Sequence, residues 1–303
     1  MNNTESTKVI GIVANLQKPI MPSVLKEFFN RVASTSFKFI ACDTLRKILK
    51  HIPSHIELVS KAELLNIAQL IASFGGDGTI LRTAEMVGSK GIPILGINLG
   101  GLGFLTASSV EKAETHIRNF FKNKLQVEKR SLLKLSIGKE PIIRYLLNDF
   151  VVDKAGFSRL IQITTYVNER MLNSYVADGL IISTPTGSTA YSLANGGPIV
   201  APSTNAFIIN PICPHTLSNR PIIISDESKI SLHIKSEIGK FNVFGDGQII
   251  GSFPLDTRIS LEKARFNINL VQTPKHEFFT ILREKLGWGE NFRLMRHAQQ
   301  NKD

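Results

Sequence analysis

The chain has 303 residues, of which 43% are hydrophobic and 20% charged, which is enough for about two domains of ~150 residues each. No apolar run approaches the ~20 residues that cross a bilayer, and residues 1–8 lack the apolar segment of a signal peptide. These features exclude a membrane-spanning chain, and we expect a globular cytoplasmic protein with no membrane partner.

The formal net charge of +11 at pH 7 would suit a protein that binds polyanions. Lysines and arginines are spread along the chain, however, and no nucleic-acid-binding motif such as an RNP sequence or zinc finger occurs. We therefore expect no nucleic-acid partner, because an enzyme for anionic nucleotides would carry the same charge bias. The two cysteines, Cys42 and Cys213, lack metal-ligand spacing, and we expect buried free thiols.

The first hundred residues alternate between short apolar runs and stretches with helical spacing. Strands that alternate with helices at these lengths predict a parallel sheet with helices on both faces, a Rossmann-like α/β domain. Ligands of such sheets bind at the carboxyl ends of the strands. The predicted strands are 8–15, 37–41, 56–59, 70–74 and 92–99, and the predicted helices are 22–34, 45–49 and 79–87.

The fourth of these strands ends in Gly75-Gly76-Asp77-Gly78-Thr79, which reads as strand, tight turn and helix. The glycines permit unusual torsions and keep side chains away from a ligand, and the helix N-terminus behind them suits an anion. Asp77 would repel a phosphate, so it suggests a group that takes a proton from a hydroxyl. It could equally cap the helix, because Asp is a preferred N-cap.

Two common nucleotide-binding motifs are absent from the sequence. The glycines of residues 96–104 do not fit G-x-G-x-x-G, and no ribose-binding acid follows them at the expected distance. There is also no G-x-x-x-x-G-K-[ST] sequence. Any nucleotide is therefore held in some other way.

A helix is predicted over 109–123, and the pattern then changes to many short β runs between residues 125 and 270. These runs predict an all-β sandwich domain, and residues 278–286 return to helical spacing before a polar tail. We therefore expect an α/β domain over 1–104, a linking helix and β-sandwich over 105–272, and a C-terminal segment over 273–303.

Two stretches of the predicted sandwich carry polar groups directly after apolar strands. Asp178 is followed by a strand and by a loop rich in small hydroxyl residues, 183–192, which ends near Tyr191. Hydroxyls and free N–H groups can bind sugar and phosphate oxygens, and the tyrosine ring can pack on a base. Asn148 and Asp149 could read an amide edge and accept from ribose hydroxyls. Either stretch could also be an ordinary turn.

Together these stretches resemble the bacterial branch of the NAD kinase family, enzymes that phosphorylate the 2′-hydroxyl of the adenosine ribose of NAD. The glycine turn alone is shared with diacylglycerol and sphingoid lipid kinases and, more loosely, with phosphofructokinases. The block from Asp178 to Tyr191, arriving after Asn148-Asp149, is far more specific. Residues 214–218, 246–248 and 285–288 also look like this branch, so the resemblance covers about 73–288.

The resemblance implies an α/β domain and a β-sandwich domain with NAD between them, and a last segment that packs back on the first domain. It implies that Asp77 is the general base, beside a phosphate-donor loop of Gly75, Gly76, Gly78 and Thr79. The positions that match NAD contacts in the family are Asp77, Gly78, Arg82, Phe104, Asn148, Asp149, Arg159, Asp178, Thr189, Ala190, Tyr191, Ser192 and Gln248.

The resemblance further implies NAD and ATP as substrates, Mg²⁺ or another divalent cation bound with ATP, no metal ligand from the protein, and a homo-dimer or homo-tetramer. Polyphosphate as the donor is left open. Many relatives carry Arg at the position of Val176, which leaves the preference between NAD and NADH open. Two alternatives stay in view: a lipid kinase that shares the glycine turn, and a noncatalytic NAD-binding regulator.

Overall fold

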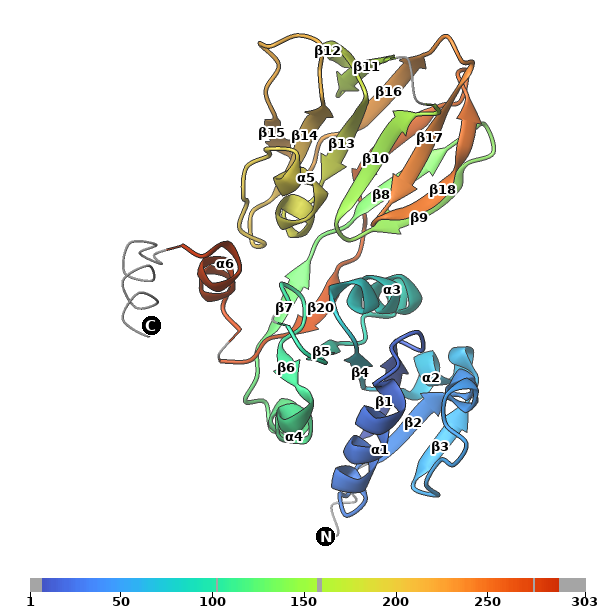
Figure 1. Cartoon of the computed structure of the whole chain (residues 1–303), viewed down its shortest axis with the longest axis vertical. Helices are drawn as coiled ribbons and strands as arrows, with labels where there is room; N and C mark the ends of the chain where they lie inside the picture. The colour runs from blue at the N-terminus through green and yellow to red at the C-terminus, as the bar shows by residue number, and fades with distance from the viewer. Residues whose placement is uncertain (1–6, 102, 157–159, 275, 289–303) are drawn as a thin grey trace, which may run out of the picture.

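The fold is described by a computed structural model that covers residues 7–101, 103–156, 160–274 and 276–288. It has two domains, one above the other in Figure 1. The first contains a mostly parallel sheet with helices on both faces, and the second contains two antiparallel sheets. The predicted fold class is therefore confirmed.

The first domain is built around a sheet of eight strands. These are β1 (Val9–Ala14), β2 (Lys38–Cys42), β3 (Ile56–Val59), β4 (Leu70–Phe74), β5 (Ile94–Asn98), β6 (Ser108–Ser109), β7 (Val127–Arg130) and β20 (Ile268–Val271). Their order is β3-β2-β1-β4-β5-β20-β7, with β6 paired to β5. All pairs are parallel except β20 with β7.

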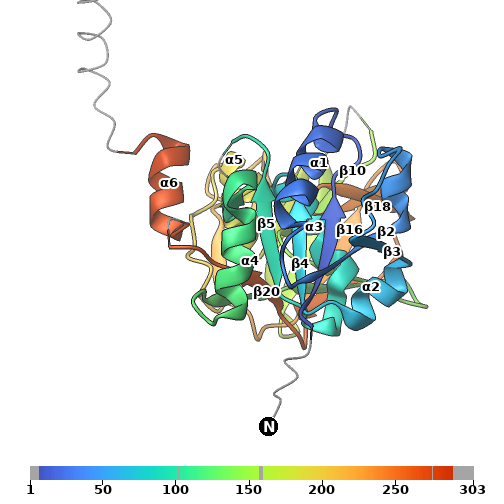
Figure 2. The same ribbon diagram turned by 90° about the horizontal axis from the view of Figure 1, so that it is seen from below.

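Helices cover both faces of this sheet, and Figure 2 shows α1 and α4 side by side over one of them. The α-helices of this domain are α1 (Met21–Val32), α2 (Lys61–Ile67), α3 (Asp77–Val87) and α4 (Ala113–Phe121), and the 3₁₀ helices are η1 (Asp43–Lys47), η2 (Gly88–Lys90) and η3 (Val110–Lys112). Leu70, Ala72 and Phe74 of β4 pack with α1 and α4, whereas Ile71 packs with α2 and α3. A strand covered on both sides is mostly apolar, which explains the composition of β4 before the glycine turn. Its one polar residue, Ser73, is buried and hydrogen-bonded to the hydroxyl of Thr83 at 2.8 Å.

The second domain is a sandwich of two six-stranded antiparallel sheets. The first sheet has the order β15-β14-β13-β10-β17-β18 and the second β12-β11-β16-β19-β8-β9, and one hydrophobic core lies between them. The strands are β8 (Leu133–Ile137), β9 (Ile142–Leu146), β10 (Asp149–Lys154), β11 (Ile161–Val167), β12 (Arg170–Ala177), β13 (Gly179–Ser183), β14 (Ala206–Ile212), β15 (Ile222–Ser225), β16 (Ile230–Lys235), β17 (Lys240–Gly245), β18 (Gln248–Pro254) and β19 (Ile259–Lys263).

Three short helical elements complete the chain. After β13 come η4 (Thr186–Thr189) and α5 (Tyr191–Ala194), and after β20 comes α6 (Phe278–Leu286). Within the described residues, no helix is long and apolar enough to cross a membrane.

Two strands that the sequence grouped with the sandwich belong to the first sheet. These are β7 and β20, which run between the domains in Figure 1 and carry the chain out of the first domain and back into it. Each has only four residues, and β propensity does not specify which sheet a short strand joins. The first domain is therefore assembled from both ends of the chain.

Within the region of predicted β runs, the apolar stretch from 142 to 152 is divided between two strands. Its halves, β9 and β10, belong to different sheets, and the chain changes sheets at Leu147 and Asn148. The expectation of buried thiols is also wrong, because Cys42 is only half-buried and Cys213 is exposed.

Phe28 is central to the core beneath α1, and its replacement tests the packing of the first domain. Its ring is fully buried, with ring centroids 4.8 Å from Phe74 and 5.8 Å from Phe39. Phe28→Ala should lower the free energy of unfolding by about 3–5 kcal/mol because it leaves a cavity. The measurement is a denaturant titration followed by circular dichroism. Phe279→Ala is the control, since that ring is 63% exposed, and equal losses in the two variants would contradict the assignment.

Candidate active site

The glycine turn connects β4 to α3 at the carboxyl end of the sheet. Gly76 is the N-cap of α3, Asp77 is the first helical residue, and no side chain caps this helix. The strand, turn and helix are thus as predicted, but the alternative that Asp77 caps the helix is wrong. Its carboxylate is free to make other contacts.

The glycines of this turn provide space and do not use unusual torsions. None of Gly75, Gly76 and Gly78 has a positive φ angle. A Cβ on Gly75 would lie 2.1 Å from Oγ1 of Thr79, so this position must be glycine for the helix to start here. Gly76 and Gly78 are exposed, and a Cβ on either would meet nothing within 4 Å. The turn therefore has an open face on which backbone can approach a ligand.

The Asp77 carboxylate is held by the loop that follows β5. Oδ2 accepts a hydrogen bond from the N–H of Phe104 at 2.9 Å, and Oδ1 accepts one from Leu105 at 3.1 Å. A Cβ on Gly103 would lie only 2.1 Å from Oδ1, so this loop wraps closely around the carboxylate. The sequence analysis missed Gly103 and Leu105, although the cluster of glycines before Phe104 was the available signal.

A second carboxylate organises the opposite side of the site. Asp246 lies in the turn between β17 and β18 with a φ of 49°, and it accepts three backbone hydrogen bonds. The donors are the N–H groups of Leu147 at 2.9 Å, Asn148 at 2.7 Å and Asp149 at 3.1 Å. These bonds fix the point where the chain changes sheets, and they place Asn148 and Asp149 together. Residues 246–248 contributed to the family resemblance, but no role was predicted for Asp246.

Burial perturbs both carboxylates of this pair. Desolvation, together with the nearby charge of Asp246, raises the pKa of Asp149 to about 7. Desolvation also raises the pKa of Asp246, although the three N–H donors oppose that effect. Near neutral pH, Asp149 is therefore the member of the pair that exchanges a proton.

A cavity of about 470 Å³ lies between α3 and the second domain. It combines apolar walls with a few carboxylate, amide and aromatic groups, which is typical of a site for a small organic ligand. The cavity is lined by Leu81, Asn148, Asp149, Val151, Asp153, Ala190, Tyr191, Phe244, Asp246 and Gly247.

The hydroxyl-rich loop uses most of its hydroxyls inside the protein. Ser183 donates to the carbonyl of Asn148 at 3.2 Å, and Thr184 donates to that of Leu147 at 2.6 Å. Ser188 is also fully buried and bonded to backbone carbonyls. Ser183 and Thr184 thus hold the sheet-changing segment in place, and Ser188 stabilises its own loop. Ligand contact by this loop stays a prediction.

The other predicted positions of the first domain lie on the surface of the turn and its loop. Gly78 and Arg82 are exposed on the first turns of α3. Phe104 is half-buried, with its ring 6.5 Å from that of Phe278 and Nζ of Lys285 5.9 Å above it. The C-terminal helix α6 thus contacts the loop that holds Asp77.

The predicted positions of the second domain are more dispersed. Thr189 and Ala190 are half-buried and Tyr191 is 47% exposed. Asp178 pairs with Lys154 at 2.5 Å, Ser192 is buried beneath the loop and bonded to Asn210, and Gln248 is exposed beside a neighbouring hollow. None of these three lines the cavity. Arg159 lies outside the described residues.

The first domain presents an acid on a glycine turn, and a cavity of about 470 Å³ lies between α3 and the second domain, an arrangement that suits a nucleotide-dependent phosphotransferase. Comparison with known families supports this class. The family profile described as ATP-NAD kinase N-terminal domain matches residues 10–125, and that described as ATP-NAD kinase C-terminal domain matches residues 147–273. The chain belongs to the NAD kinase family.

Comparison with individual relatives supports the same family. An NAD kinase of Flavobacterium psychrophilum is 37% identical over 295 residues, 96% of both chains. One from Geotalea daltonii is 39% identical over 246 residues, 79% of this chain and 87% of the relative. This chain is accordingly an enzyme that phosphorylates NAD, and nothing in these relatives favours a lipid kinase.

Two solved structures of similar fold contain nucleotides, one NADH and the other ATP. Yeast NADH kinase complexed with NADH has a TM-score of 0.86 and 26% identity, with 95% of this chain and 90% of that chain covered. An NAD kinase from Archaeoglobus fulgidus in complex with ATP has a TM-score of 0.68 and 27% identity, with 90% and 98% covered.

The close approach of Gly103 to Asp77 can be tested directly. Gly103→Ala should reduce turnover about tenfold or more, because the added methyl group must displace either the carboxylate or the loop. The measurement is kcat for NADP formation. Gly101→Ala is the matched control from the same loop, since its Cβ would meet nothing within 4 Å. Equal activity of the two variants would show that the contact is unimportant.

Proposed function

We propose that the enzyme transfers the γ-phosphate of ATP to the 2′-hydroxyl of the adenosine ribose of NAD, with Asp77 as the general base. The observation that carries this proposal is the fixed carboxylate of Asp77, oriented by two backbone N–H groups. Leu81 lies one turn further along the same face of α3 and lines the cavity. An acceptor hydroxyl at the mouth of this cavity would therefore come close to Asp77.

For the acceptor, the proposed contacts are grouped around the cavity. Asn148 and Asp149 would bind amide and hydroxyl groups of NAD, and Tyr191 would pack on a ring. Asn148, Asp149, Ala190 and Tyr191 line the cavity, and Thr189 precedes Ala190, which supports these assignments. Asp178 and Gln248 lie further out, and Ser192 would act by supporting the loop.

For the donor, the exposed glycines and the first N–H groups of α3 suit ATP phosphates. Phosphoryl transfer needs mostly positioning and neutralisation of charge, to which the exposed Arg82 could contribute. Among the described residues no group of three His, Cys, Asp or Glu side chains is placed to hold a metal ion. Mg²⁺ is commonly held by substrate phosphates and one or two carboxylates, so we propose that the divalent cation arrives with ATP.

The proposal includes ATP as the donor, a cytoplasmic location and a homo-oligomer. Val176, on β12, is 42% exposed. It is an apolar side chain at the position where many relatives carry an arginine. Its effect on the choice between NAD and NADH is open to direct measurement. The deciding assay offers purified protein NAD, ATP and Mg²⁺ and follows NADP formation, then repeats the reaction with NADH and with polyphosphate.

The role of Asp77 predicts that Asp77→Asn lowers kcat about 100-fold or more while the dissociation constant for NAD changes little, because the variant lacks the proton acceptor. Single-turnover kinetics and equilibrium NAD binding measure the two quantities. Asp43→Asn is the matched control, since Asp43 is an exposed acid at the first position of η1. Near-normal turnover of Asp77→Asn would rule out the general base.

The raised pKa of Asp149 predicts a pH dependence of NAD capture. If the carboxylate accepts from ribose hydroxyls, kcat/KM for NAD should rise with pH around a midpoint of about 7, because Asp149 is protonated below that pH in the free protein. Asp149→Asn should lower kcat/KM and remove this rise. Asp153→Asn, at another carboxylate of the same cavity, should keep it. A rise that persists in Asp149→Asn would assign the titration to another group.

A further inference from the structure

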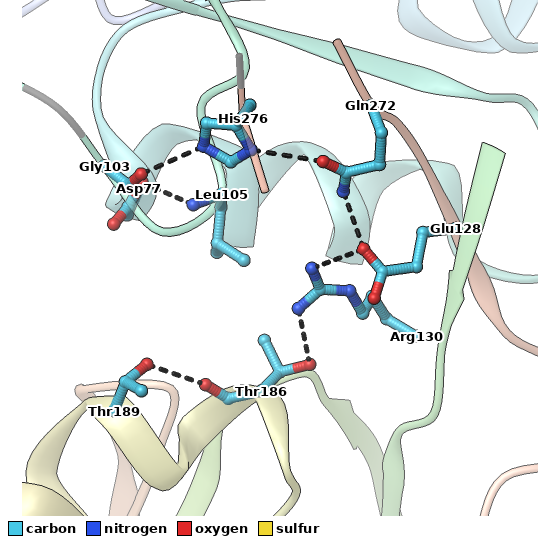
Figure 3. A network of polar contacts seen from close by, with 9 residues as sticks. All are labelled: Asp77, Gly103, Leu105, Glu128, Arg130, Thr186, Thr189, Gln272 and His276. Atoms are coloured by element: carbon cyan, nitrogen blue, oxygen red, sulfur yellow. Dashed lines mark hydrogen bonds and ion pairs between the residues drawn. The ribbon is translucent and has the colours of Figure 1, made fainter. Parts of the chain in front are cut away.

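A line of polar side chains crosses from one domain to the other beside the site, and Figure 3 shows its members. Arg130 is the last residue of β7, where the chain leaves the first domain, and it is only 4% exposed. One terminal nitrogen donates to Oε2 of Glu128 at 2.8 Å, and the other donates to Oγ1 of Thr186 at 3.3 Å. Arg130 therefore ties the first sheet to the start of η4 in the second domain.

The same carboxylate continues the line toward Asp77. Oε2 of Glu128 also accepts from Nε2 of Gln272 at 2.8 Å, and Oε1 of Gln272 lies 3.1 Å from Nδ1 of His276. Nε2 of His276 lies 3.1 Å from the carbonyl oxygen of Gly103, and His276 is 6% exposed. Gly103 is directly followed by the two residues whose N–H groups hold Asp77.

The line of polar side chains therefore connects the two halves of the proposed site. One end is the loop that orients Asp77, and the other is Thr186, whose carbonyl accepts from the hydroxyl of Thr189 at 3.3 Å. Gln272 and His276 come from the returning C-terminal segment, so four separate parts of the chain meet here.

We propose that Arg130 and His276 are positioning residues that set the distance between Asp77 and the Thr186–Thr189 turn, and thereby the approach of the base to the acceptor hydroxyl. This inference rests on the proposed function. Neither residue needs to touch a substrate, because each acts through a neighbour: His276 through the carbonyl of Gly103, and Arg130 through Thr186.

The number of hydrogen-bond donors and acceptors along the line shows which protonation state of His276 completes it. Both of its ring nitrogens face oxygen acceptors, Gly103 O and Gln272 Oε1, while the NH₂ group of Gln272 is used on Glu128. A neutral imidazole has one N–H and can satisfy only one acceptor, whereas the imidazolium satisfies both. The line is therefore complete only when His276 is protonated.

Several groups act on this proton. Burial, the largest effect, lowers the pKa of His276, and the charge of Arg130 lowers it further. The carbonyl of Gly103 and the charges of Asp77 and Glu128 raise it. Loss of the proton as pH rises would remove one link of the line, so the positioning role should weaken toward higher pH.

The test uses the full-length enzyme and compares kcat with the dissociation constant for NAD. His276→Ala should lower kcat about 10- to 100-fold, since a small misplacement of reacting groups has effects of this size, and should change NAD binding by less than about threefold. His276→Gln can still donate to Gly103, so it should recover part of kcat and lose the pH dependence that His276 causes. His116→Ala is the control, because His116 is a half-buried histidine whose hydrogen bond, within the part of the chain that the structure describes, is to Ser108 and not to Gly103.

The end of the line in the second domain is tested with Thr186→Val. This substitution keeps the shape of the side chain and removes the hydroxyl that accepts from Arg130. Its control is Thr165→Val, since the buried Thr165 hydroxyl has no hydrogen-bond partner. Thr186→Val should lower kcat, and in the double variant with His276→Ala the loss should be smaller than the product of the single losses, because both changes interrupt one line.

Three results would overturn the inference: kcat of His276→Ala within about twofold of the unmodified enzyme, losses that appear in NAD binding and not in kcat, or losses that multiply in the double variant. If His276→Ala does not fold, His276→Gln and Thr186→Val still decide the question through kcat and its pH profile. These outcomes are distinct from failure of the general base, which Asp77→Asn reports separately.

Discussion

The site depends on the hydrogen bonds from Phe104 and Leu105 to the Asp77 carboxylate. These bonds connect the turn after β4 to the loop after β5, so two neighbouring strand ends are fixed by one side chain. Each carboxylate oxygen has a further lone pair, so orientation by the backbone does not exhaust its capacity to accept a proton. The arrangement requires glycine at position 103, because a larger residue would occupy the space of the carboxylate itself.

The carboxylate of Asp246 has the opposite structural role to that of Asp77. Asp77 is held by backbone N–H groups, whereas Asp246 holds backbone by accepting from three successive N–H groups at the point where the chain changes sheets. Asp149 is buried beside Asp246, and desolvation, together with the nearby charge of Asp246, raises the pKa of Asp149 to about 7. Asp246 thus both fixes the backbone at Asn148 and Asp149 and contributes to the raised pKa of Asp149.

Sequence reasoning succeeded where a local pattern determines the structure. The apolar strand before Gly75 and the periodic helix after Asp77 predict the turn, since burial on both faces and helical spacing are visible in a single segment. It failed where contacts between distant segments of the chain determine the structure. The membership of β7 and β20 in the first sheet depends on pairing across about half the chain. Arg130 and His276 are linked, through Glu128 and Gln272, because those strands lie side by side. In the hydroxyl-rich loop, composition does not distinguish hydroxyls that bond inside the protein, such as those of Ser183 and Thr184, from hydroxyls that face outward.

Charge is distributed unevenly around the site, in a way that fits the two substrates of the proposed reaction. The chain carries a net charge of +11, yet carboxylates of Asp149, Asp153 and Asp246 line the cavity. Such a cavity disfavours phosphate and favours hydroxyl groups, which donate to carboxylates. The adjacent glycine turn has the opposite character, because the first N–H groups of α3 favour anions. Asp77 belongs to the glycine turn and lies one helical turn before Leu81, which lines the cavity, so the proposed transfer of a phosphoryl group to a hydroxyl would take place at the boundary between these two regions.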